Sequence, residues 1–400
     1  MNKSFARELY LIFHDEGILI FFIVVPLLYP LIYSFIYTDE VVRDVPVCVV
    51  DESHSVESRK FIRLVDATAD VKVVAYASDQ HEAQKLRRER KTYGYICIPS
   101  DFGDLITHGE QAHIGVFTDM SGMLYYKAIV MASTNASLEM NADIKLSRSK
   151  TTTAEQDKAT VSPIRYDEVA LFNPQGGFAA FLIPAVLMLI LHQTMLLGVG
   201  MSAGTRREQR QQRIAAGMHE VHRSLFKALR DALHRTWGRC FAYIVVFIPV
   251  SAYVLSVVPR IFNLVQIGSF PDVAMLMLPF LLAVVFFAET ISHLVTRRET
   301  IILLIVFTSV PLLFLSGVSW PGCALPPFWH HFAMFFPSTF GINAFVKINT
   351  CGASLAEVRT EYISLWIQAG AYFVMCVYLT LWEKSREYRQ EIAWFEEPDL

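Results

Sequence analysis

Residues 315–347 place the strongest constraint on how this chain can fold. Apolar runs flank the segment, but four prolines interrupt it: Pro321, Pro326, Pro327 and Pro337. Because proline breaks a helix, each piece is too short to cross a hydrocarbon core of about 30 Å. Irregular backbone survives at membrane depth only where protein buries it or a watery cavity meets it. We therefore expect residues 319–350 to form a re-entrant hairpin, two short helices that enter the membrane from outside and return.

Six other segments have the length and composition of membrane-spanning helices. They are residues 17–37, 177–201, 241–258, 273–294, 301–317 and 363–382. Each is close to the roughly 20 residues that a helix needs to cross a bilayer. The first is longer than the apolar core of a cleavable signal, so we expect it to be retained. Charged residues make up only 18% of the chain, below the roughly 25% of soluble domains.

The net charge and the absence of known motifs argue against several classes of function. The formal net charge of −3 gives no reason to expect nucleic acid as a partner. The motifs G-x-x-x-x-G-K-[ST], H-E-x-x-H and G-x-S-x-G do not occur, so ATP hydrolysis and other catalysis are not expected in this chain. No C-x-x-C pair suggests a metal site. Cys323 and Cys351 share one predicted loop, where they either form a disulfide or are two free buried thiols.

Lysine and arginine near the span ends predict which loops are cytoplasmic. Residues 202–239 carry nine basic residues, and the tail adds Lys384, Arg386 and Arg389. The loops 259–272 and 318–362 together offer only Arg260, Lys347 and Arg359. This asymmetry predicts that both termini and the loop 202–239 are cytoplasmic and that residues 39–175 are outside.

Residues 39–175 have the alternation of a globular α/β domain. Strands are expected at 45–50, 71–76, 93–98 and 112–117, and helices at 55–67, 79–90 and 120–146. Strands that alternate with helices favour a partly parallel sheet. Residues 150–158 are expected to form a loop, and 162–172 an extended return to the membrane.

The complete prediction is an α-helical integral membrane bundle with an inserted α/β extracytoplasmic domain. The bundle has six transmembrane helices and the re-entrant hairpin. Residues 1–16 form a cytoplasmic amphipathic helix, 17–38 the first span, 176–382 a five-helix block and 383–400 a cytoplasmic tail. The expected location is the inner membrane of a bacterial cell.

The amphipathic helix is inferred from the spacing of apolar residues near the N-terminus. Phe5, Leu9, Ile12 and Phe13 fall at i, i+4, i+7 and i+8, which is one face of a helix. The polar residues lie elsewhere: Lys3, Arg7, Glu8 and Asp15. The alternative is that these residues are the solvated start of a longer first helix.

Three ionisable residues in the spans are candidates for function: Glu289, His293 and His192. Glu289 and His293 stand at i, i+4 and share a helix face. Ionisable groups at membrane depth are candidates for substrate or proton handling; the alternative is a structural pair or a residue at the wet boundary. His192 could line a pathway, although a single histidine is weak evidence. His330 and His331 diverge by about 100° on a helix, which favours interfacial histidines over a metal pair.

Two short motifs carry a family resemblance. Ser316-Gly317, Pro321, Leu325-Pro326-Pro327 and Pro337-Ser338-Thr339 follow one another in an order that resembles the last third of type-2 ABC export permeases. Such permeases often place a Glu and a Gly-Thr pair just after the second span. Here the segment reads Gly204-Thr205-Arg206-Arg207-Glu208, with the pair before the Glu.

The resemblance covers most of the chain. It implies that this chain is one of the two permease subunits of an exporter. Two permease subunits, identical or related, would pair and bind two cytoplasmic ABC ATPase subunits. ATP and Mg would be cofactors of the partner, and none is expected in this chain. The implied docking candidates are Arg206, Arg207, Glu208, Arg210 and Arg213. The gate candidates are Ser316, Gly317, Pro321, Pro326, Pro327 and Pro337.

Alternatives stay open for the basic loop, the cargo and the function class. Membrane topology and contact with anionic lipid explain the arginines equally well. Aromatic-rich spans suit an amphipathic or lipid-like cargo, but they also suit contact with lipid. The runner-up function is a membrane receptor or anchor whose outer domain binds a ligand or protein. An intramembrane enzyme using Glu289 and His293 lacks a nucleophile and a defined metal set.

Cysteine labelling tests the predicted topology. We would introduce Ser149→Cys and Ser224→Cys separately in a cysteine-free background and treat intact cells with an impermeant reagent. Position 149 should react and position 224 should not, because only the first is predicted to be outside. Both positions should react after lysis, which is the control. Reaction at 224 with none at 149 rejects the topology.

Overall fold

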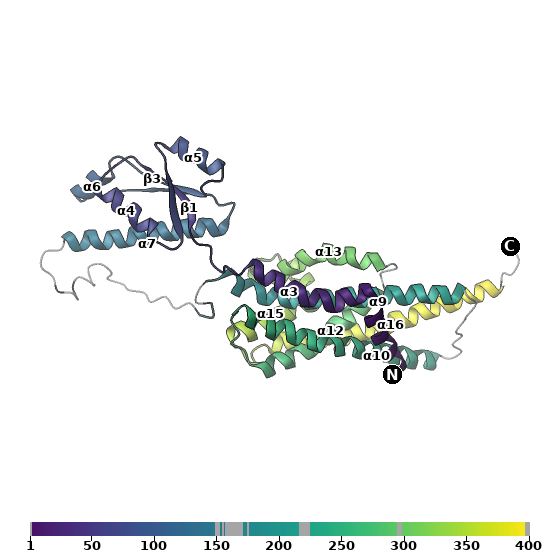
Figure 1. Cartoon of the computed structure of the whole chain (residues 1–400). Coiled ribbons are helices and arrows are strands. Elements are labelled where there is room, and N and C mark those ends of the chain that lie inside the picture. The colour runs from purple at the N-terminus through teal and green to yellow at the C-terminus, as the bar shows by residue number, and fades with distance from the viewer. Residues whose placement is uncertain are drawn as a thin grey trace. The chain divides into compact units, whose positions relative to one another are not determined.

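The computed structural model describes residues 2–148, 153, 156, 171–173, 176–215, 225–293 and 298–396. It divides the chain into two compact units. One comprises Met1–Glu40 with Ala170–Leu400, and the other is Val41–Val169. Figure 1 shows the first as a helical bundle and the second as an α/β domain. The expected loop 150–158 and the expected extended segment 162–172 lie almost entirely outside the described residues.

The smaller unit is built on a four-stranded sheet in the order β2-β1-β3-β4. Its elements are β1 Val45–Asp51, α4 Val56–Asp66, β2 Val71–Tyr76, α5 Gln80–Arg88, β3 Gly94–Ile98, α6 Phe102–His108, β4 Gly115–Thr118 and α7 Met123–Arg148. β1 pairs parallel with β2 and β3, and β3 pairs antiparallel with β4. The predicted, partly parallel sheet is therefore confirmed, and α6 is an addition.

Strand alternation explains why helices cover both faces of this sheet. Val45, Val47 and Val49 pack toward α4, α6 and α7, whereas Cys48 and Val50 pack toward α5. Successive side chains of a strand point to opposite faces, so β1 must be apolar on both. β1 is thus the central strand of a three-layer arrangement (Figure 1).

The larger unit contains six helical segments long and apolar enough to cross a membrane. These candidate spans are Glu16–Ile36, Phe178–Arg213, Lys227–Ile261, Phe270–Ser292, Arg298–Leu315 and Arg359–Glu383. Their elements are α2 Glu16–Leu19, η1 Ile20–Val24, α3 Val25–Ile36, α9 Phe178–Ala215, α10 Leu225–Ala252, η2 Tyr253–Val257, α11 Val258–Ile261, α12 Phe270–Ser292, α13 Arg298–Leu315 and α16 Arg359–Glu396. Six spans were predicted, and six candidate spans are found among the residues that the structure describes.

The stretch 202–239 was predicted as a cytoplasmic loop that contains helix-forming segments, and the structure describes helices in it. α9 continues to Ala215 and α10 already begins at Leu225, so most of this stretch is helical. Only 216–224 separates the two helices, and those residues lie outside the described part. The sequence from Arg206 to Ala215 is rich in Arg, Gln, Glu and Ala, which favour helix even when no apolar run supports it.

α9 is the central helix of the bundle and packs against α3, α12, α13 and α15 Pro337–Cys351. Two glycines allow its neighbours to approach closely. A Cβ on Gly198 would stand 1.7 Å from Cε2 of Phe22, and one on Gly204 would stand 3.2 Å from Cα of Arg298. Small residues are typical of helix contacts in membranes, because lipid supplies no hydrophobic force to drive helices together.

The N-terminal helix is separate from the first span, so the alternative of one longer helix is wrong. α1 Asn2–His14 ends before Asp15, whose backbone is extended and whose side chain accepts from the backbone N–H groups of Gly17 and Ile18. The predicted apolar face is only partly correct. Ile12 is buried, but Phe13 is 52% exposed and Glu8 is 2% exposed. Glu8 faces inward because it has an ion-pair partner there, described below.

The proline-rich segment forms a 3₁₀ turn and two helices; two short helices were predicted here, and the 3₁₀ turn is an addition. After α13 the chain turns at Gly317, with φ of +83°, and continues through η3 Gly322–Ala324, α14 Pro327–Ala333 and α15. The break between α14 and α15 means that 328–346 do not form one helix. α15 has 15 residues, so its length of about 22 Å is below a full crossing.

Cys323 and Cys351 match neither the possible disulfide nor the two buried free thiols that the sequence suggested. Cys323 and Cys351 are free thiols, so no disulfide joins them, and both are exposed. The prediction that the free thiols would be buried is therefore wrong. Cys323 lies in the turn before α14, and Cys351 is the last residue of α15.

Candidate functional site

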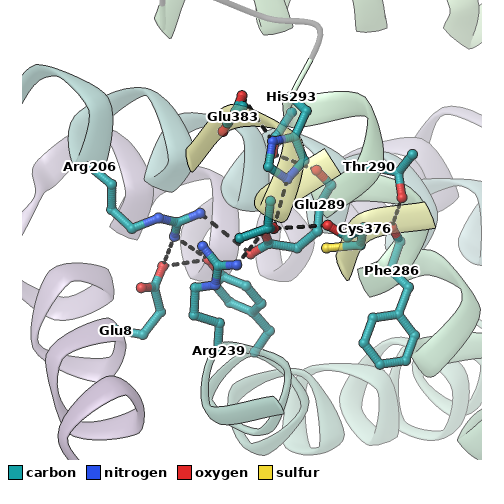
Figure 2. Close-up of polar contacts among 12 residues, drawn as sticks. Glu8, Arg206, Arg239, Phe286, Glu289, Thr290, His293, Cys376 and Glu383 are labelled. Carbon is teal, nitrogen blue, oxygen red and sulfur yellow. Dashed lines mark hydrogen bonds and ion pairs between the residues drawn. The ribbon is translucent and has the colours of Figure 1, made fainter. Parts of the chain in front are cut away.

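Charged side chains from four helices meet inside the bundle (Figure 2). Glu8 comes from α1, Arg206 from α9, Arg239 from α10 and Glu289 from α12. Nη1 of Arg206 pairs with Oε1 of Glu8, and its Nη2 lies 3.4 Å from Oε1 of Glu289. Nη2 of Arg239 lies 3.3 Å from Oε2 of Glu289. Two guanidinium groups therefore balance two carboxylates.

Burial makes this cluster energetically important. The side chains of Glu8 and Glu289 are 3% and 2% exposed, and those of Arg206 and Arg239 are 16% exposed each. The hydroxyl of Tyr243 donates to Glu8 and accepts from Arg206 Nη1 at 2.8 Å. Removing one partner of a buried ion pair typically costs about 3–5 kcal/mol, because the other charge is left without compensation.

A second cluster lies next to the first and joins α9 to α16. Arg207 donates to Oε1 of Glu383 at 2.7 Å and to the carbonyl of His293 at 3.3 Å. Nδ1 of His293 lies 3.0 Å from the same Glu383 oxygen. Glu289 and His293 share a face of α12, as predicted, but the structure gives their side chains different ion-pair partners (Figure 2).

A third cluster joins α9 to the start of the first span and to α13. Both carboxylate oxygens of Asp15 accept from Nη2 of Arg298, at 2.8 and 2.9 Å. The hydroxyl of Thr205 donates to Asp15 at 3.1 Å. Gly204 makes room for Arg298, as described above. The segment Gly204–Arg207 therefore contacts all three clusters, with successive residues pointing in different directions around α9.

This segment is the one that the sequence motif singled out, but the structure gives its arginines internal partners. Arg206 and Arg207 are paired within the bundle. Glu208, Arg210 and Arg213 are exposed on the following turns of α9. Partial burial and then the nearby charge of Arg213 lower the pKa of Arg7 on α1.

Sequence reasoning missed several members of these clusters: Asp15 and Glu8 as partners, Tyr243, Arg239, Arg298 and Glu383. One signal was present, since Arg239 and Tyr243 stand at i, i+4 and so share a face at the edge of an apolar run. The sequence contains no comparable spacing that would have pointed to Glu8. Its partner Arg206 is 198 positions away.

Glu289, His293 and Cys376 bring three potential metal ligands together. Their ligand atoms lie within 4.8 Å of one another. Figure 2 labels all three side chains. However, each oxygen of Glu289 faces a guanidinium, at 3.4 and 3.3 Å. Two positive charges at this distance repel a cation, so we assign Glu289 to the ion-pair cluster rather than to a metal centre.

The irregular backbone around α14 is held by side chains of α15 and α16. Asn343 donates to the carbonyl of Ser316 at 3.0 Å, and Thr339 to that of Ala333 at 2.8 Å. From α16, Gln368 donates to the carbonyl of Met334 at 2.7 Å, and Tyr372 donates to that of Phe335. Protein groups thus satisfy the carbonyls that no helix satisfies, which is the condition for irregular backbone at membrane depth.

The remaining candidates from the sequence are dispersed. Ser316 and Pro337 are buried, whereas Pro321, Pro326 and Pro327 are exposed. His192 is fully buried on α9, 5.8 Å from the ring of Phe287, and its nitrogens have no hydrogen-bond partner among the described residues. His330 and His331 are both exposed on α14, with rings 6.0 Å apart.

Comparison with known families decides the class of this bundle. A family described as "ABC-2 family transporter protein" matches residues 17–378. The chain belongs to this family. It is the membrane permease subunit of an ABC transporter, as the sequence motifs suggested. ABC-2 permeases typically have no catalytic activity and generally pair with an ABC ATPase. No curated protein matches the chain.

A double-mutant cycle tests the central cluster of this ABC-2 permease. Arg206→Met and Glu8→Gln should each lower the free energy of unfolding by about 3–5 kcal/mol, because each leaves the buried cluster with one uncompensated charge. The double variant should lose less than the sum, since the two residues compensate each other. Chemical unfolding in detergent, followed by tryptophan fluorescence, measures this, because all tryptophans lie in the bundle unit.

The control is the ion pair Lys347–Glu361 on α15 and α16, in which the side chain of Lys347 is 51% exposed and that of Glu361 is 14% exposed. Lys347→Met with Glu361→Gln should change stability by less than about 1 kcal/mol. Strictly additive losses for Arg206 and Glu8 would show that the two side chains do not stabilise each other.

Proposed function

We propose that this permease exports its substrate from the cytoplasm or the inner leaflet, driven by ATP hydrolysis in a separate subunit. The observation that carries the proposal is the segment Gly204–Arg207, which contacts α1, α10, α12, α13 and α16 through three charge clusters. A movement of α9 at this end must move or break these contacts. In this proposal the termini and this end of the bundle are cytoplasmic, and residues 41–169 are outside.

The docking surface that we propose lies just beyond these clusters. Glu208, Arg210 and Arg213 are exposed on the last turns of α9, where complementary charges on an ATPase could fix its register. Arg206 and Arg207 would then transmit the movement of the docked ATPase into the bundle and would not touch the ATPase themselves. Contact of the exposed arginines with anionic lipid is the competing explanation.

Charge exchange separates docking from transmission. Glu208→Arg with Arg210→Glu keeps the net charge but should reduce the ATPase recovered with the tagged permease from its native membrane. The control is Lys347→Glu with Glu361→Lys, which exchanges a charge pair at the start of α16. This variant should leave the recovery of the ATPase unchanged. Arg206→Met should retain the ATPase but lower its stimulation by the permease. Normal recovery and stimulation in the first variant would exclude docking at these residues.

The cargo that we expect is amphipathic or lipid-like, as the aromatic-rich spans suggest. The same purification tests this expectation when bound small molecules are identified by mass spectrometry. A hydrophilic cargo would contradict it.

The hairpin of α14 and α15 is proposed as part of the outer gate. α16 supports this, because one rigid helix carries Tyr372 and Gln368 at the hairpin and Glu383 at the second charge cluster. Tyr372 and Glu383 are eleven positions apart, or about 16 Å along a helix. Movement of α9 at Arg207 would therefore pull on the hydrogen bonds that hold the hairpin.

The exposed thiol of Cys323 reports on this gate. In a Cys351→Ser background, the alkylation rate of Cys323 should change when the complex hydrolyses ATP. Tyr372→Phe removes one hairpin hydrogen bond and should raise the rate without ATP, whereas Tyr378→Phe, an exposed tyrosine of the same helix, should not. An alkylation rate that ATP hydrolysis leaves unchanged would contradict the gate.

A further inference from the structure

The α/β unit contains a cavity that the transport proposal does not use. It has a volume of about 480 Å³ and lies beside the carboxyl ends of the parallel strands β1 and β2. Asp51 ends β1, Tyr76 ends β2, and Arg59 and Arg63 lie on α4. This volume is in the usual range of ligand pockets, and the carboxyl ends of parallel strands are the usual place for them.

A β-bulge aims Tyr76 at the cavity. Val47 of β1 pairs with Val73 of β2, but the next residue, Cys48, pairs with Ala75, so one residue of β2 is extra. In an unbroken strand, Ala75 would share the face of Val73 and Tyr76 would point away. Instead Val73 packs beneath α4, and Ala75 packs in the core on the opposite face. Tyr76 then lines the cavity, 67% exposed.

The loop after β1 is also shaped toward this cavity. The carboxylate of Asp51 accepts from the backbone N–H groups of Ser53 and His54, at 3.1 and 3.0 Å, and from the hydroxyl of Ser58 at 2.8 Å. His54, which lines the cavity, has φ of +49°. A positive φ is uncommon for a residue other than glycine, and the hydrogen bonds of Asp51 hold the loop in this conformation.

Positive charge dominates the wall formed by α4. Arg59 and Arg63 stand at i, i+4 and line the same cavity, where they repel each other. Arg59 donates to the carbonyl of His54 at 3.2 Å, and Arg63 to that of Arg59 at 3.3 Å. Within the described part of the chain, neither guanidinium pairs with a carboxylate. The cavity lining therefore carries two positive charges and one carboxylate. That carboxylate, Asp51, already accepts the hydrogen bonds described above.

We propose that this cavity binds a small anionic ligand with an apolar portion. Arg59 and Arg63 would hold its carboxylate or phosphate group, because guanidinium groups bind such oxygens through paired hydrogen bonds. The ring of Tyr76 and the side chain of Val56, which is 65% exposed, would contact the apolar portion. The anionic group could belong to a lipid headgroup or to a soluble metabolite.

Calorimetric titration of the full-length protein in discs of zwitterionic lipid tests the proposal. The probes are hexyl phosphate, inorganic phosphate and hexanol, which separate the anionic group from the apolar portion. Hexyl phosphate should bind with saturation and more tightly than either of the other two. Arg59→Ala with Arg63→Ala should weaken it at least tenfold. Lys85→Ala with Arg88→Ala, which removes the same charge from the exposed side of α5, should not.

Tyr76→Ala should weaken hexyl phosphate and leave inorganic phosphate unchanged. Equal melting temperatures of the arginine variant and the α5 control keep loss of binding distinct from unfolding. Discs with anionic lipid then separate the two sources, since competition with hexyl phosphate indicates a lipid headgroup and its absence a soluble anion. The proposal is wrong if hexyl phosphate binds no better than hexanol, or if the arginine variant binds as tightly as the control.

Discussion

The guanidinium of Arg206 lies between the carboxylates of Glu8 and Glu289, and the packing of α1, α9, α10 and α12 depends on this placement. Neither carboxylate could stay buried alone, because an ionised group without a partner is strongly unfavourable in a low dielectric. The pairing therefore selects one arrangement of the helices among the many that apolar packing permits. It also explains why α1 turns a glutamate inward and leaves Phe13 exposed.

In the same arrangement one helix, α16, contacts both polar regions of the bundle, the charge clusters and the hairpin. α16 contacts the charge clusters through Glu383 and the hairpin through Gln368 and Tyr372. Helical hydrogen bonds do not run continuously from α14 into α15, and side-chain donors of α15 and α16 bind the carbonyls of Ala333, Met334 and Phe335 where the helix breaks. A few bonds that break together are a suitable basis for a two-state element. In the proposed mechanism, α16 would couple the two regions, because the same helix carries polar groups at both contacts.

Local physics explains what could be predicted from the amino-acid sequence. The spans follow from the length of apolar runs, and β1 to β3 follow from short apolar segments between helical patterns. The break at Pro337 follows from proline chemistry, because its ring prevents α14 from continuing. In the stretch 202–239 the helices extend beyond the apolar runs, since hydropathy marks where a helix leaves the membrane and not where it ends.

The site itself depended on contacts between distant positions. Arg206 was predicted as a docking candidate from the resemblance of the segment after the second span, and only folding brings it to Glu8, 198 positions away. Likewise the segment 71–76 was predicted as a strand, but the bulge that turns Tyr76 toward α4 comes from its pairing with β1. The sequence alone therefore determined the six spans, the α/β unit and the broken hairpin, because each depends on neighbouring residues. The tertiary structure decided which charges pair and which side chains share a cavity, because those depend on residues that only the fold brings together.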